Sequence, residues 1–314
     1  MRKTVLIIIS LFSLVLATAT VWHWPNPEVV QIPSPVKSEI NEKAIQKPLE
    51  QTVQYQYEIP RTLRYSFTLK NTGHRLLKEA EFWAPAPVKQ TATQKVRHIE
   101  TSHPHEKLTD ILGNQVLHFV FSTIPPYASK QVSVTIELRL AKKLNPIPAQ
   151  PQWFMDDEPF IEVSHPKIQA TAKRLETKEK LLTTRNIFNW VATHIQYAGY
   201  LRENRGALYA LVNKRGDCTE YMSLFTALTR ANGIPTRAIG GYVYNDDAIL
   251  RPEDYHNWAE FYLENKWQIA DPQNKVIQEK QSNYIAMRII SKHSKWATSP
   301  RFWTANQDLK VRMN

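Results

Sequence analysis

The hydrophobic pattern of this 314-residue chain changes from a period of two to the helical period between residues 141 and 163, and this change constrains the fold more than any other feature. Within residues 52–141, apolar residues alternate with polar ones, in runs at 63–69, 117–121 and 132–140. Such alternation is typical of half-buried strands, because successive strand side chains point to opposite faces. Asn, Gly and Pro residues typical of turns separate the runs. We therefore expect an all-β, immunoglobulin-like sandwich over 52–141.

After a proline-containing linker expected at 142–162, apolar residues recur three and four positions apart, which is the helical period. The pattern predicts helices from Pro166 to about Leu175 and from about Thr177 to Ile195, and a helical turn near 207–212. Strand-like sequences follow, the first of them at 236–244. The segment 163–290 thus predicts an α+β domain with a helical lobe and an antiparallel sheet.

The only cysteine of the chain, Cys218, lies where a helix is predicted to begin. Asp217 and Glu220 have the spacing of a capping box, so Cys218 becomes the first helical residue, and Asn232 with Gly233 marks the helix end. The positive end of the helix dipole favours a thiolate, whereas Asp217 opposes it, so a cationic partner such as histidine is needed. The alternative is an inert buried cysteine, but a polar helix start does not demand burial.

A candidate partner lies in a predicted hairpin. If Glu264 and Asn265 form a two-residue turn, Asp271 falls opposite Trp258 on the neighbouring strand. His256 then shares a face with Trp258 and is a diagonal neighbour of Asp271, about 7 to 8 Å away. The same register places four apolar side chains together on one face, those of Trp258, Tyr262, Trp267 and Ile269.

Three motifs together resemble the transglutaminase-like superfamily, whose core is related to papain-type cysteine proteases. They are RGDCTEY at 215–221, HNWAEFY at 256–262 and IADP at 269–272, and the resemblance covers roughly 163–290. It implies a catalytic triad with Cys218 as nucleophile, His256 as general base and Asp271 as the acid that orients the histidine. The preceding sandwich is similar to a domain often found before this core in exported bacterial and archaeal members.

The resemblance implies acyl transfer from an amide through a thioester. The backbone N–H of Cys218 can donate to the oxyanion, and Tyr197 and Tyr209 are candidates for a second donor, with a role as core aromatics as the alternative. We expect water to resolve the thioester, as in a protease or amidase, because favouring an amine requires an apolar channel and a lid. A crosslinking transglutaminase and an inactive binding or assembly module are the alternatives.

No cofactor or metal is expected. The acidic loop 245–247 has fewer oxygen ligands than calcium requires, and His103 and His105 lack further ligands. The formal net charge of +11 suggests attraction to anionic envelope polymers or membrane surfaces. The expected partners are a protein or peptide substrate, with cell-wall peptide as one candidate, and nucleic acid is not expected.

The beginning of the chain predicts export. Arg2 and Lys3 precede an apolar run, and Ala17-Thr18-Ala19 has the form of a signal peptidase site. We expect a signal peptide over 1–19, with an uncleaved membrane anchor as the alternative, followed by a proline-rich linker at 20–51. The domain would then act in the periplasm or outside the cell, and 291–314 would form a basic tail.

Overall fold

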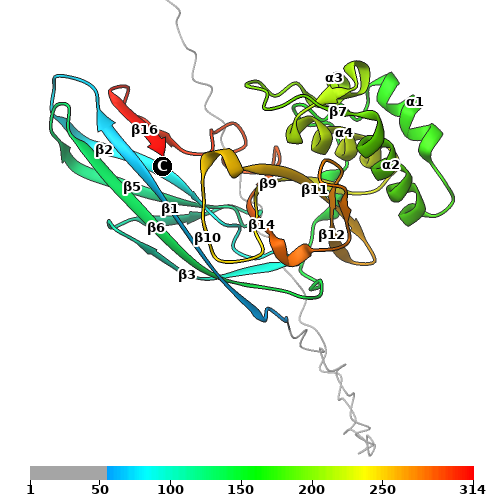
Figure 1. Cartoon of the computed structure of the whole chain (residues 1–314), viewed down its shortest axis with the longest axis horizontal. Coiled ribbons are helices and arrows are strands. Elements are labelled where there is room, and N and C mark those ends of the chain that lie inside the picture. The colour runs from blue at the N-terminus through cyan, green and yellow to red at the C-terminus, as the bar shows by residue number, and fades with distance from the viewer. Residues whose placement is uncertain (1–54) are drawn as a thin grey trace, which may run out of the picture. The chain divides into compact units, whose positions relative to one another are not determined.

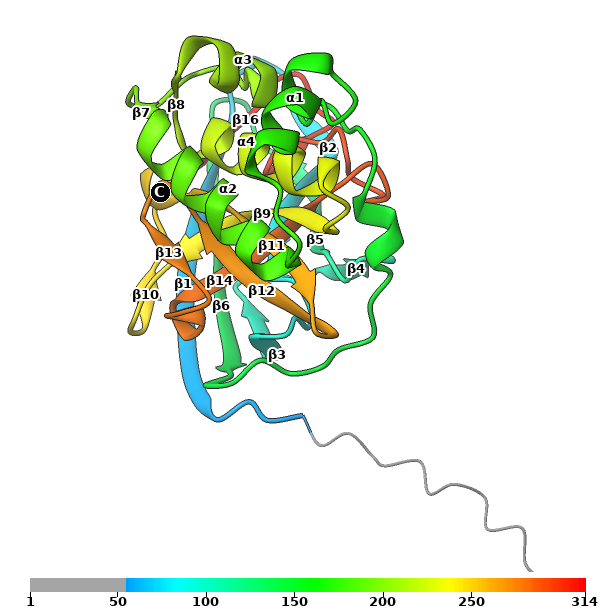
Figure 2. The same ribbon diagram turned by 90° about the vertical axis from the view of Figure 1, so that its right-hand side faces the viewer.

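The computed structural model describes residues 55–314, which fall within one compact unit spanning 52–314. The predicted signal peptide at 1–19 and the linker at 20–51 lie outside the described residues. Among those described, no helix is both long and apolar enough for a membrane span. Figures 1 and 2 show helices on one side of this unit and long strands on the other.

Two sheets form the sandwich that the alternating pattern predicts, and all their strand pairs are antiparallel except the short parallel pair of β1 and β10. The first sheet has the strand order β10-β1-β6-β3, and β16 also pairs with β1. The second sheet has the order β15-β2-β5-β4. Their strands are β1 (Ile59–Asn71), β2 (Leu77–Ala86), β3 (Gln94–Thr101), β4 (Glu106–Thr109), β5 (Gln115–Ile124), β6 (Ser129–Leu140), β10 (Ala248–Ile249), β15 (Trp303–Thr304) and β16 (Leu309–Met313). The immunoglobulin-like type of this sandwich stays a prediction.

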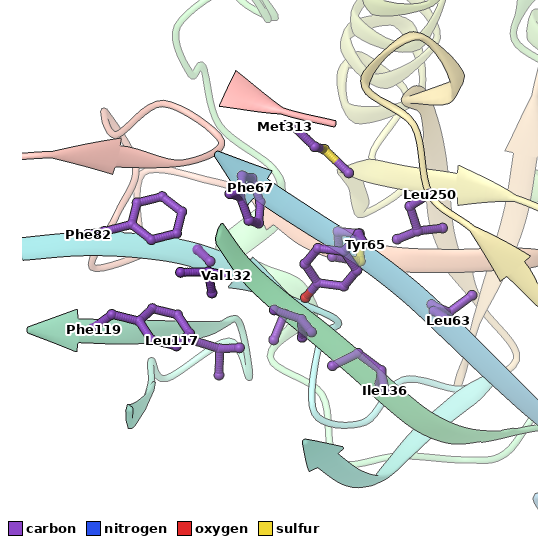
Figure 3. Packing of buried hydrophobic residues seen from close by; sticks show 14 of the residues in the cluster. Leu63, Tyr65, Phe67, Phe82, Leu117, Phe119, Val132, Ile136, Leu250 and Met313 are labelled. Carbon is purple, nitrogen blue, oxygen red and sulfur yellow. The ribbon is translucent and has the colours of Figure 1, made fainter. Parts of the chain in front are cut away.

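Figure 3 shows the sandwich core, in which inward-facing residues of both sheets meet. Phe67 of β1 contacts Phe82 of β2 edge-to-face, with ring centroids 5.1 Å apart. Met313 of β16 and Leu309 are buried in the same core. The segment expected as a basic tail therefore contributes a strand to each sheet, since β16 pairs with β1 and β15 pairs with β2. Its apolar residues cover parts of the core that would otherwise be exposed at these two strands.

The helical lobe agrees closely with the periodicity. It contains α1 (Pro166–Leu175), α2 (Lys180–His194), α3 (Gly206–Asn213) and α4 (Cys218–Ala231). Helix α4 is the central element, and its residues 220–230 are buried on all sides rather than along one stripe. It packs against the other helices and against the neighbouring sheet, so its first turn is held firmly in place.

This neighbouring sheet is antiparallel, with the order β13-β12-β11-β9-β14. Its strands are β9 (Thr236–Val243), β11 (His256–Leu263), β12 (Lys266–Asp271), β13 (Val276–Ile277) and β14 (Tyr284–Ile290). One face packs on α4 through Ala259 and Phe261, while Trp258 and Trp267 lie in a separate core on the opposite face. In Figure 1 the sheet lies between the helices and the sandwich.

The stretch expected as a linker at 142–162 packs against this opposite face. It contains the 3-10 helix η1 (Pro151–Phe154), and the buried Phe154 ring contacts Trp267 edge-to-face with centroids 5.3 Å apart. Glu158 is also buried and pairs with Arg230 of α4 at 3.0 Å. The prolines suggested a free connector, but these apolar and charged contacts attach it to the domain.

Two further 3-10 helices connect the strands. They are η2 (Pro252–Asp254), directly before β11, and η3 (Gln281–Asn283), directly before β14. Two short strands, β7 (Gln196–Tyr197) and β8 (Arg215–Gly216), pair in parallel. This pairing places Tyr197 opposite Gly216, two residues before Cys218.

Candidate functional site

Cys218 is the first residue of α4, as the capping box predicts. The Asp217 carboxylate accepts from Thr219 N at 2.8 Å and from Leu201 N at 2.9 Å, and Glu220 accepts from Asp217 N at 3.0 Å. Both acidic side chains are therefore occupied by backbone donors. The Cys218 thiol is half-buried, and it lies at the positive end of the helix dipole.

The residue before this cap has no room for a side chain unless its neighbours move. A Cβ atom on Gly216 would lie 2.2 Å from the Glu220 Cβ, well inside van der Waals contact. The glycine thus lets the backbone pass directly over the capping glutamate. This close approach explains the glycine in the sequence RGDCTEY.

The predicted hairpin has the predicted register. Leu263 pairs with Lys266, and the turn residues Glu264 and Asn265 both have positive φ, as a type I′ turn requires. His256 Nε2 lies 2.7 Å from Asp271 Oδ2, so the two strands bring these side chains into hydrogen-bonding contact. The Asp271 side chain is 1% exposed, which excludes water from this contact.

Two residues not identified from the sequence also hold the Asp271 carboxylate. Tyr284 donates its hydroxyl to Oδ2 at 2.9 Å, and the Asn274 side chain donates to the same oxygen at 2.8 Å. Asn274 also contacts His256 Nε2 at 3.2 Å. Asn274 lies three residues after Asp271 in a turn, which is a weak sequence signal, whereas nothing local indicates Tyr284.

The electrostatics of His256 favour its charged form. Burial by itself lowers the pKa of the imidazole, but hydrogen bonds from the ring to Asp271 and Cys218, together with the charges of both, raise the pKa of His256 to about 9. The histidine is therefore an imidazolium at neutral pH. Since Nε2 faces Asp271, the other ring nitrogen, Nδ1, is available to the thiol.

Cys218 and His256 open into a cleft of about 370 Å³. Its wall is largely polar and includes the aromatic side chains of Tyr197, Tyr200, Tyr244 and Tyr255 and the carboxylates of Asp217, Glu253 and Asp254. Substrate can thus reach the sulfur directly from solvent. A peptide-sized group fits into a cleft of this volume.

The two tyrosines predicted as oxyanion donors lie in different places. Tyr197 lines the cleft and is 56% exposed, so it remains a candidate. Tyr209 is not among the residues that line the cleft, and its role as an oxyanion donor stays a prediction. It lies on α3 with its ring under the Arg205 guanidinium, whose central carbon is 5.1 Å from the ring centroid.

Comparisons with known proteins agree with this architecture. A profile of the transglutaminase-like superfamily matches residues 169–272. No curated protein matches the chain. A solved structure from Cytophaga hutchinsonii, described as a candidate cysteine protease, is 14% identical with a TM-score of 0.54, over 82% of this chain and 92% of that one.

Two further solved structures are less similar. The periplasmic domain of TgpA from Pseudomonas aeruginosa is 17% identical with a TM-score of 0.38, over 69% of this chain and 92% of that one. The transglutaminase of red sea bream is 12% identical with a TM-score of 0.28, over 72% of this chain and 50% of that one. The profile match and the shared fold lead to one conclusion: residues 169–272 form a core of the transglutaminase-like superfamily.

Proposed function

We propose that the protein is a thiol-dependent hydrolase that cleaves peptide or side-chain amides through Cys218, His256 and Asp271. The observation that carries this proposal is the buried 2.7 Å contact between His256 and Asp271 beside the thiol. A histidine held by a carboxylate on one nitrogen and facing a thiol on the other is the arrangement that cysteine acyl transfer requires.

In the first half of the reaction, the Cys218 thiolate attacks the amide carbonyl carbon, and the carbonyl oxygen becomes an oxyanion. The backbone N–H of Cys218, at the start of α4, can donate to that oxygen, and the Tyr197 hydroxyl is the candidate second donor. The C–N bond then breaks as the His256 imidazolium gives its proton to the leaving amine. A thioester and a neutral imidazole remain, with Asp271 still holding the ring.

In the second half, the neutral His256 takes a proton from a water molecule, whose oxygen attacks the thioester carbonyl. The C–S bond breaks, the carboxylic acid leaves, and the thiolate–imidazolium pair is restored. The sum of both halves is one amide plus one water giving one acid and one amine. No other reactant is needed.

The shape of the site favours water over an amine as the acceptor. Trp258 and Trp267, the two tryptophans of the hairpin, are 1% and 2% exposed and lie in the core behind the sheet, so they line no apolar channel beside the thiol. The wall of the cleft is mostly polar and open to solvent. Water is therefore present at the thioester, and nothing in the cleft wall selects against it.

We further propose that this reaction takes place outside the cytoplasm, because the first residues resemble an export signal. Peptide crosslinks of the cell wall are one substrate of this class. The net charge of +11 supports contact with anionic envelope polymers.

The test is to incubate the purified full chain with a glutamine-containing peptide and a large excess of a primary amine, and to analyse the products by mass spectrometry. We expect carboxylic acid products from the side-chain or backbone amide. Efficient amine incorporation with little acid would overturn the choice of water and establish a transglutaminase. Cys218→Ala is the matched control, and equal product formation by that variant would refute the thiol mechanism altogether.

A further inference from the structure

Within residues 55–314, the Cys218 sulfur accepts a hydrogen bond from a side chain that the proposed mechanism does not use. The Asn257 side-chain amide lies with Nδ2 3.5 Å from the Cys218 sulfur and 3.0 Å from the Thr219 hydroxyl. We propose that Asn257 is a further catalytic residue, whose amide donates a hydrogen bond to the Cys218 sulfur and stabilises its thiolate form. This inference deepens the proposed function and rests on Cys218 being the nucleophile.

The strand geometry explains how Asn257 reaches the thiol. Successive residues of β11 point to opposite faces, so Asn257 shares a face with Ala259 and Phe261 rather than with His256. That face packs on α4, as the edge-to-face contact between Phe225 and Phe261 shows. Asn257 therefore faces the first turn of α4, where Cys218 begins the helix.

Space for the amide comes from the neighbouring strand. Asn257 pairs with Gly240 of β9, and a Cβ atom on Gly240 would lie only 3.0 Å from the Asn257 Oδ1 and 2.1 Å from the Tyr255 hydroxyl. The missing side chain leaves room for both groups. The bond to Thr219 then fixes the amide to the same helical turn that carries the nucleophile.

The chemistry of an amide differs from that of the histidine. An N–H donor binds a negatively charged sulfur more strongly than a neutral thiol, so it favours the thiolate. His256 gives up its proton when the amine leaves, whereas an amide keeps its protons at every step. Asn257 can therefore also stabilise the thiolate as it departs from the thioester.

Other titratable groups surround the sulfur and set the background for this effect. His256, Tyr255 and the carboxylates of Asp217, Glu253 and Asp254 line the same cleft as the sulfur. The carboxylates disfavour the thiolate, and His256 favours it. The contribution of Asn257 must therefore be measured with all of these groups in place.

The experiment measures the rate of Cys218 alkylation by iodoacetamide against pH, in the full chain, by intact mass. Because the chain has one cysteine, each added mass reports this thiol alone. We expect Asn257→Leu to raise the midpoint of the alkylation profile by about one pH unit, the lower end of the range for a hydrogen bond to a charged group. Asn257→Asp, which keeps the shape but places a carboxylate beside the sulfur, should raise it further.

Thr219→Val is the matched control, because it removes the other partner of the amide and leaves the contact with the sulfur. We expect a smaller shift than for Asn257→Leu. Equal midpoint shifts in Thr219→Val and Asn257→Leu would mean that Asn257 acts by holding the helix start, and this would overturn the proposal. An unchanged midpoint in Asn257→Asp would also overturn it. Thermal melting identifies any variant that does not fold, and Asn257→Ala, which also lacks the donor and adds no charge, then decides in place of Asn257→Leu.

Failure of this inference can be distinguished from failure of the proposed function. The alkylation profile depends on the thiol and its neighbours and needs no substrate. If wild-type protein hydrolyses the peptide but its profile does not respond to Asn257, only this inference fails. If the profile responds but Cys218→Ala forms product as fast as wild type, the proposed function fails.

Discussion

The ionisation of His256 makes a quantitative prediction about stability. The pKa of His256 in the folded protein is raised to about 9, against an ordinary value of about 6.5 for an exposed histidine. Each pKa unit corresponds to about 1.4 kcal/mol, so the difference represents about 3 kcal/mol of folding free energy. The His256 side chain is only 13% exposed, so solvent reduces this value little.

The sign of the effect follows from proton binding. Between pH 6.5 and 9 the folded protein retains a proton on His256 that the unfolded chain has already lost. The stabilisation is therefore fully present below about pH 6.5 and is lost as the pH rises through about 9. This is the opposite of the usual behaviour of a paired carboxylate.

Urea unfolding of wild type and of His256→Gln from pH 6 to pH 10 measures this contribution. We expect the difference in unfolding free energy between the two proteins to decrease by about 3 kcal/mol over this range. Asp271→Asn should remove the largest share of the decrease, because the hydrogen bond to Asp271 is the main cause that raises the pKa. A difference that stays constant from pH 6 to pH 10 would refute the charged pair.

Three further predictions concern activity and folding. Cys218→Ala and His256→Ala should abolish turnover while thermal melting shows an intact fold, and unfolding of both variants would indicate a role in the core instead. Gly216→Ala should lower the unfolding free energy by about 1–3 kcal/mol, measured in urea, since its methyl group meets the Glu220 Cβ at 2.2 Å, and an unchanged value would contradict the steric reasoning. Tyr197→Phe should reduce kcat by about 10- to 100-fold with little change in KM if its hydroxyl binds the oxyanion, whereas a change in KM alone would argue for substrate binding.

Local features of the sequence were sufficient for much of the site. The capping box around Cys218 and the two-residue turn at Glu264 and Asn265 involve residues close in the chain, and both form as predicted. The turn sets the register, and the register brings His256 to Asp271. Because these are local interactions, their partners can be identified from spacing alone.

Distant contacts were not predictable in the same way. Tyr284 and Asn257 carry no local signal for their hydrogen bonds to Asp271 and Cys218. The first bond depends on where β14 pairs within the sheet, and the second depends on how α4 packs on that sheet. The role of Tyr209 stays a prediction, because a helical period does not tell which side of α3 faces the cleft. The two tryptophans at 258 and 267 are an exception, because the hairpin register predicts that they pack on one face and both are buried there.

The sequence by itself determined the strand and helix periods, the start of the cysteine helix and the hairpin that pairs the histidine with its acid. Only the tertiary structure decided that the stretch after residue 290 returns to the sandwich as β15 and β16, and that 142–162 packs against the sheet. The physical reason is that caps, turns and alternation are satisfied within a few residues. The choice of a distant partner strand or packing face depends instead on which apolar surface remains uncovered after the rest of the chain has folded.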